Sequence, residues 1–146
     1  MVTDGAGLVA VICESQPAVA AAMVHTLADL YGLRIAATVR TGTQVLAAAA
    51  AARPDLAVVD LASAATYGLR IVGELHQIVP DCAVILAAPP EFGGLRLDAV
   101  AAGAITLVVT SDLRPLQCGI ERLIHTHGEN CPSCAARERE TYFRNA

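Results

Sequence analysis

The sequence predicts an α/β fold in which a five-stranded parallel sheet is covered by helices on both faces. Five short apolar runs, rich in Val, Ile, Leu and Ala, alternate along the chain with segments of helical periodicity. Runs that are apolar at nearly every position are typical of strands buried on both faces, as in parallel sheets. Right-handed crossovers between such strands give a doubly wound, three-layer sandwich. The predicted strands are 8–13, 33–39, 56–61, 82–88 and 105–109.

Turn and cap residues delimit the helices between these strands. Pro17 stands in the first turn of the first helix, where its missing N–H does no harm, and Gly32 follows the end of that helix. Thr41 or Thr43 can cap the second helix, and Pro54 interrupts the chain after it. The predicted helices are 17–30, 41–52, 67–79, a short one that ends at 102, and 112–124.

Composition limits the kinds of protein that this chain can be. The chain has 146 residues and 55% hydrophobic residues, which suits one ordered domain, and we place it at 1–127 with a tail at 128–146. The net charge is −4 and all ten basic residues are Arg, so the basic surface expected of a nucleic-acid binder is missing.

No run reaches the ~20 apolar residues of a membrane span, and no signal peptide is recognised, so we expect a cytoplasmic protein without membrane contact. The five cysteines are an odd number, which favours thiols or metal ligands over a disulfide framework.

Asp60 is the most informative residue in the apolar runs. It closes an otherwise apolar strand, and ligands of open parallel sheets bind at the carboxyl ends of the strands. A carboxylate in this place can accept a phosphoryl group or bind a cation. It can equally cap the loop that follows. The position alone leaves both roles open.

Several dispersed but collinear motifs resemble response-regulator receiver domains, most closely those of the NarL type. The resemblance covers about residues 8–125 and rests on the runs Val11-Ile-Cys-Glu-Ser-Gln-Pro17, Arg53-Pro-Asp-Leu-Ala-Val-Val-Asp-Leu61, Gly68-Leu69, Val79-Pro-Asp81 and Ala102-Gly-Ala104. It implies a flavodoxin-like, CheY-like fold and a regulatory rather than enzymatic role in two-component signal transduction or transcription control. It also implies that Asp60 stands at the phospho-acceptor position.

The chain differs from this family at the residues that carry out the family's phosphorylation chemistry. Glu14 and Ser15 stand in place of the acidic pair that holds Mg²⁺, and a neutral hydroxyl is a poor ligand for that ion. Ala87 replaces a hydroxyl residue, and Thr110 replaces a conserved Lys in a chain without any Lys. Phosphoryl transfer needs cations to neutralise charge on the transferred oxygens. We therefore expect a pseudo-receiver in which Mg²⁺ binding is absent and phosphotransfer is weak or absent. The alternative is a receiver that is still phosphorylated at Asp60.

The tail carries a possible metal site. His125, His127, Cys131 and Cys134 stand within ten residues, and four such ligands are compatible with tetrahedral Zn²⁺. The two cysteines can instead act as a redox or inter-subunit thiol pair, in a metal- or redox-sensing regulator. The plainest alternative is a tail whose His and Cys residues have no joint role.

The expected partner is another protein. Residues 135–141 resemble the start of a NarL-type DNA-binding domain. Only five residues follow in this sequence, too few to complete a helix-turn-helix, so we expect no direct DNA binding. The resemblance implies a homodimer through the fourth helix, fifth strand and fifth helix. A small ligand beside Asp60 also stays open, because the residues around it are small. The expected dimer surface includes Leu95, Leu97, Val100, Leu107, Leu113 and Leu116.

Overall fold

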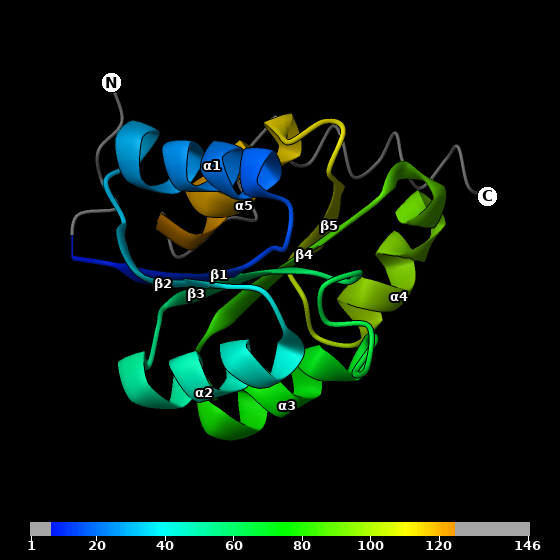
Figure 1. Ribbon diagram of the computed structural model, residues 1–146, viewed down its shortest axis with the longest axis horizontal. Coiled ribbons are helices and arrows are strands. Elements are labelled where there is room, and N and C mark those ends of the chain that lie inside the picture. Colours follow the sequence, from blue (N-terminus) through cyan, green and yellow to red (C-terminus); the bar gives the residue numbers. More distant parts are fainter. Residues whose placement is uncertain (1–6, 125–146) are drawn as a thin grey trace.

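The computed structural model describes residues 7–124, which contain a five-stranded, fully parallel sheet with strand order β2-β1-β3-β4-β5 (Figure 1). The order reverses direction after β1, as in doubly wound sheets. The predicted fold class is therefore confirmed. The strands are β1 (Val9–Cys13), β2 (Arg34–Val39), β3 (Leu56–Asp60), β4 (Ala83–Ala88) and β5 (Thr106–Val109).

Helices cover both faces of the sheet (Figure 1). Helices α1 and α5 lie on one face, and α2 and α3 lie on the other, with α4 beside β4 and β5. The last turns of the first helical segment are π-helical (η1), and a 3₁₀ segment (η2) precedes α4. The bounds are α1 (Pro17–Val24), η1 (His25–Leu30), α2 (Gly42–Ala52), α3 (Arg70–Ile78), η2 (Pro90–Leu95), α4 (Arg96–Ala101) and α5 (Arg114–Ile124).

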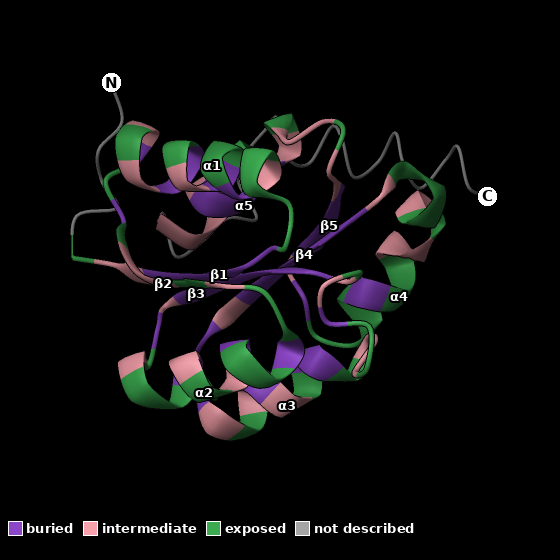
Figure 2. Ribbon diagram, in the orientation of Figure 1, coloured by how far each residue is buried: buried purple, intermediate pink, exposed green. Residues whose placement is uncertain are grey.

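The core is divided by the sheet into two layers (Figure 2). Successive side chains of a strand point to opposite faces, so each strand contributes to both layers. Val59 packs toward α2 and α3, whereas Ile12 and Val58 pack toward α1 and α5. This alternation also fixes which side chains at the strand ends face the same layer.

Local signals explain the limits of α2. Thr41 accepts a hydrogen bond from the Gln44 N–H, and the Gln44 side chain accepts from the Thr41 N–H, which together form a capping box. Arg53 ends the helix with φ of 46°, in the left-handed region. Of the two residues that could cap this helix, Thr41 and Thr43, the structure uses Thr41.

The third predicted helix begins later than expected. Residues 61–69 form turns after β3, and α3 starts at Arg70 instead of residue 67. The ring of Tyr67 lies against α2, where a Cβ added to Gly42 would come within 2.5 Å of it. Gly68 has a φ of 56°, in the left-handed region, which a helix running from residue 67 could not contain.

The expected boundary at 127/128 and the tail at 128–146 lie outside the described residues. Within residues 7–124, no helix has both the length and the apolar character needed to cross a bilayer.

Candidate functional site at the carboxyl ends of the strands

The carboxyl ends of the strands bring the sequence-predicted residues to one edge of the sheet. Asp60 pairs directly with Ala87 in the neighbouring strand, and the pairing of Cys13 with Val59 places Glu14 level with Asp60. Because side chains alternate along a strand, those of Glu14, Asp60 and Ala87 all point toward the α1/α5 face of the sheet. Thr110 follows β5, and its N–H donates to the carbonyl of the β4 residue Ala88 over 2.9 Å.

The carboxylate of Asp60 is buried and held by its own loop. The side chain is 3% exposed. Its Oδ2 accepts hydrogen bonds from the Ser63 N–H at 3.1 Å and the Ser63 hydroxyl at 2.9 Å. Its Oδ1 is buried without a hydrogen-bond partner among the described residues. The carboxylate therefore caps the turn that follows it, the second of the two roles left open above, while one oxygen stays unpaired.

Ser63 links this loop to the end of β1. Its hydroxyl oxygen accepts from the Ser15 N–H at 3.0 Å and lies 3.1 Å from the Ser15 hydroxyl. The sequence motifs assign no role to Ser63. A hydroxyl residue three positions after an Asp is a signal for a local side-chain–backbone turn, and this signal could have identified it.

Glu14 is the second buried carboxylate of the site. It is 3% exposed, its Oε2 accepts from the Gln16 N–H at 3.1 Å, and its Oε1 has no partner among the described residues. Burial raises the pKa of Glu14 above its ordinary value; the negative charge of Asp60 adds to this rise, and the Gln16 N–H opposes it. The neighbouring Cys13 thiol points to the other face, and burial with the two negative charges raises its pKa to about 12. This thiol is therefore protonated and unreactive near neutral pH.

No salt bridge among residues 7–124 neutralises these two carboxylates. The ion pairs between His25 and Asp29 and between Arg114 and Asp112 involve neither carboxylate. The receiver fold implies Mg²⁺, and the unpaired oxygens of Glu14 and Asp60 are donors that such an ion prefers. However, within the described part of the chain no three His, Cys, Asp or Glu side chains lie together as a metal site. Among residues 7–124, Glu14 and Asp60 therefore offer two carboxylates to such an ion, without a third side chain of these types beside them.

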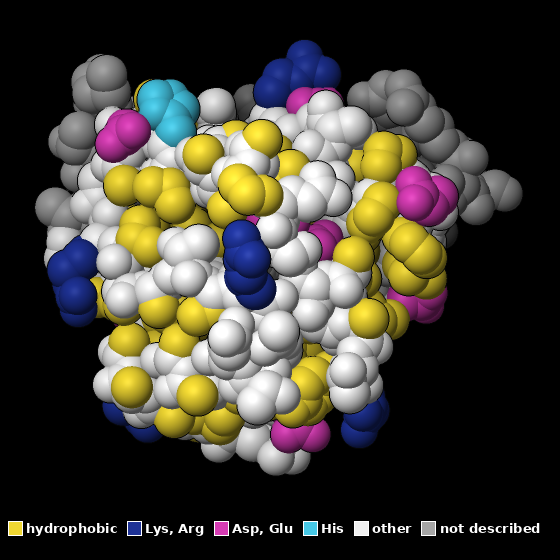
Figure 3. Space-filling view, viewed as in Figure 1, with side chains coloured by type: hydrophobic (Ala, Val, Ile, Leu, Met, Phe, Trp, Pro, Cys, Tyr) yellow, Lys and Arg dark blue, Asp and Glu magenta, His cyan; other side chains and the backbone are white. Residues whose placement is uncertain are grey.

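The remaining predicted sites have different outcomes. The prediction that Leu107 and Leu116 lie on the dimer surface is wrong: both are buried, Leu107 in the core layer on the α2/α3 face of the sheet and Leu116 in the layer on the α1/α5 face. Leu97 and Val100 are exposed by 54% and 46%, and hydrophobic side chains gather over α4 on the right of the face in Figure 3.

The predicted zinc ligands His125, His127, Cys131 and Cys134 lie outside the described residues, so that site stays a prediction.

Comparisons with known proteins agree on the fold. No protein-family profile matches the sequence, and no curated protein matches it. Solved structures do match. A LuxR-family two-component response regulator from Aurantimonas sp. SI85-9A1 has a TM-score of 0.71 and 18% identity, over 90% of this chain and 97% of that one. A LuxR-family DNA-binding response regulator from Staphylococcus aureus has a TM-score of 0.69 and 19% identity, over 80% and 98%.

A third match is the receiver domain of AraT, a response regulator from Geobacillus stearothermophilus, with a TM-score of 0.68 and 14% identity over 82% of this chain and 94% of that one. The chain therefore has the fold of response-regulator receiver domains, as the motifs predicted. Identities below one fifth do not carry the chemistry of those proteins to this chain. The chemistry must be argued from the residues at the strand ends.

Proposed function

We propose that this chain is a cytoplasmic regulatory module with a receiver fold that acts through protein–protein contacts, with phosphotransfer weak or absent. Signal transduction or transcription control is the setting that its structural neighbours support, since those named above are response regulators. The single observation that carries the chemical part is the environment of Asp60. This carboxylate is buried beside a second carboxylate, and no positive group pairs with either in the described residues.

Phosphorylation of Asp60 would increase the negative charge in this place. A phosphoryl group carries about −1.5 to −2 charge near neutral pH, and its transfer is catalysed by cations that neutralise the charge on its oxygens. Here Ala87 contributes a methyl group and Thr110 a neutral hydroxyl where the fold's relatives supply a hydroxyl and a Lys. Glu14 adds a negative charge of its own when it is ionised. The site thus lacks the groups that would stabilise the transition state.

The test is direct phosphorylation of the full chain. Purified protein is incubated with a small acyl phosphate and Mg²⁺, and the mass of the intact protein and of the peptide that contains Asp60 is measured. We expect little or no added phosphoryl group. The variant Asp60→Asn supplies the baseline because it lacks the acceptor oxygen. Stoichiometric labelling of the natural chain that is lost in Asp60→Asn would overturn the proposal in favour of a working receiver.

The protein-contact part of the proposal rests on α4. Leu97 and Val100 are exposed large apolar side chains on this short helix, and together they form an apolar patch. We infer that the patch makes a homodimer contact, with Leu95 and Leu113, which are half-buried, at its margin. Light scattering of the full chain over a range of concentrations measures the oligomeric state, and a monomer at all concentrations would contradict this part.

A further inference from the structure

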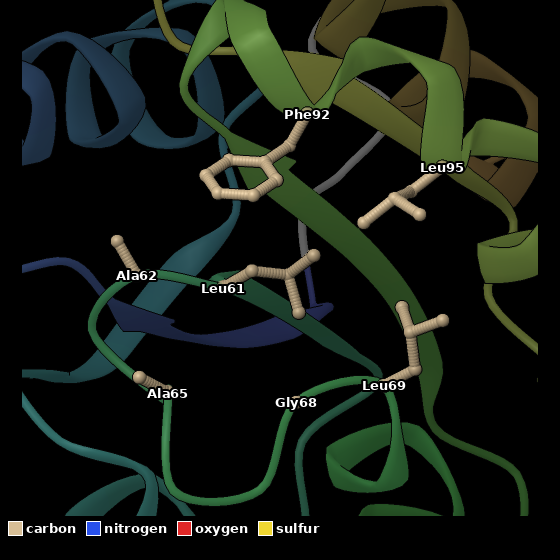
Figure 4. A pocket seen from close by; sticks show the side chains of 7 residues that line it. All are labelled: Leu61, Ala62, Ala65, Gly68, Leu69, Phe92 and Leu95. Atoms are coloured by element: carbon tan, nitrogen blue, oxygen red, sulfur yellow. The ribbon is translucent and has the colours of Figure 1, made fainter.

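A hollow lies beside the Asp60 loop, between that loop and η2. Its volume is about 370 Å³. Figure 4 shows Leu61 at the end of β3, Leu69 at the start of α3, and Phe92 and Leu95 descending from η2, all around one space. The alanines Ala62 and Ala65 complete the wall on the loop side.

The chemistry of the walls is uniform. Every side chain that lines the hollow is aliphatic or aromatic, and none carries a charge or a hydrogen-bonding group. The volume falls within the ~300–1,000 Å³ of small-molecule pockets. Phe92 is 46% exposed, although a large aromatic ring is stabilised by removal from water. A charged or strongly polar ligand would lose its hydration here without gaining a partner.

We propose that this hollow binds a small, uncharged, apolar molecule, such as a single or fused aromatic compound or a short aliphatic chain. Its volume, within the range of small-molecule pockets, favours such an occupant over a protein surface. The exposed apolar side chains of α4, Leu97 and Val100, do not line the hollow. The hollow has walls contributed by two separate loops, which suits an occupant of limited size.

The position connects such a ligand to the Asp60 site. Leu61 directly follows Asp60, and its N–H donates to the Ala87 carbonyl over 2.7 Å. Two residues further on, Ser63 holds the Asp60 carboxylate through its N–H and hydroxyl. A ligand packed between Leu61 and Phe92 would brace one conformation of this loop, and a ligand shifts a conformational equilibrium by its differential affinity for the two states. This inference goes beyond the proposed function: it adds a ligand signal at the place where a receiver takes its phosphoryl signal.

The test uses an uncharged aromatic fluorophore, N-phenyl-1-naphthylamine, titrated with the full chain. We expect saturable binding to one site per chain. The variant Ala65→Phe puts a ring into the hollow from an exposed loop position and is expected to weaken binding at least tenfold. The matched control Ala47→Phe adds the same ring on the exposed face of α2 and is expected to bind as the natural chain does. Circular dichroism verifies that both variants are folded.

Each other outcome overturns the proposal. Absence of saturable binding to the natural chain excludes the site, and equal binding by Ala65→Phe places the fluorophore elsewhere. If Ala65→Phe abolishes self-association in light scattering while the natural chain binds no fluorophore, the hollow is covered by a second copy. A phosphorylation assay without the fluorophore reports on the proposed function separately, so the two failures are distinguishable. As a second readout, amide NMR signals of Asp60 and Ser63 are expected to shift on binding in the natural chain only.

Discussion

The hydroxyl of Ser63 donates a hydrogen bond of 2.9 Å to Oδ2 of Asp60, and the N–H of the same residue donates a second bond of 3.1 Å to that oxygen. Both donors come from the loop that the aspartate itself begins. The carboxylate at the centre of the site is thus held by a neighbour three residues away.

Removal of the Ser63 hydroxyl should therefore destabilise the protein. A hydrogen bond to a charged group contributes roughly 1.5–3 kcal/mol, and Ser63→Ala is expected to lower the free energy of unfolding by an amount near the lower end, because the N–H bond remains. Urea denaturation measures it. The control is Ser15→Ala, whose hydroxyl contacts Ser63 but not Asp60 and is exposed. Equal losses in the two variants would show that the Asp60 bond is not the source.

Glu14 makes stability depend on pH. Burial raises its pKa in the folded state above the value of 4.5 for the free side chain, so between the two values the folded state binds more protons than the unfolded state. The contribution of Glu14 to stability is thus fully present below the unfolded pKa and is lost as pH rises through the folded pKa.

It follows that Glu14→Gln should be more stable than the natural chain at neutral pH, with a difference that disappears in acid. Thermal unfolding across pH 4–8 provides the measurement. Glu91→Gln, at an exposed position, is the matched control and should show no such trend. A Glu14→Gln variant that is less stable than the natural chain at neutral pH would mean that the ionised carboxylate has a favourable partner.

A third carboxylate should create a Mg²⁺ site beside Asp60. Ser15 is exposed and lies within hydrogen-bond distance of Ser63, which contacts Asp60. In Ser15→Asp we expect Mg²⁺ to raise the melting temperature, because a ligand that binds only the folded state stabilises it. The natural chain is expected to show no rise with millimolar Mg²⁺. A comparable rise in both proteins would show that Glu14 and Asp60 suffice for the ion.

The contact between Gly42 and Tyr67 should behave as a coupled pair. A Cβ at position 42 would come within 2.5 Å of the Tyr67 ring, so Gly42→Ala is expected to destabilise by about 1–3 kcal/mol through overpacking, despite the better helix propensity of Ala. Tyr67→Ala removes the ring that clashes. The double variant should therefore lose less stability than the sum of the single variants. Additive losses would disprove the coupling.

The α4 patch should control self-association without affecting the fold. Leu97→Glu places a charge on an exposed position and is expected to convert a dimer into a monomer in light scattering, with little change in stability. By contrast, Leu107→Ala removes a side chain from the core and should cost about 2–5 kcal/mol. A dimer that survives Leu97→Glu would exclude this patch as its interface.

Local patterns in the sequence determined the architecture. Both faces of a parallel sheet are covered, so its strands are apolar at nearly every position. For this reason β1, β3 and β4 could be recognised as continuous apolar runs in the sequence. Thr41 was recognisable as one of two candidate caps, with Thr43, because capping depends on residues only three positions apart. A charge at the end of an apolar strand likewise made Asp60 visible.

Only the tertiary structure decided the contacts between segments far apart in the chain. The burial of Glu14 beside Asp60 depends on the pairing of β1 with β3, and the hollow depends on the approach of η2 to the loop after β3. Leu107 and Leu97 are the same residue type, yet one lies in the core and the other in solvent. Periodicity reports how a segment is arranged along its own axis. Which face meets which neighbour, and whether a charge meets a partner there, is set by packing across the whole domain.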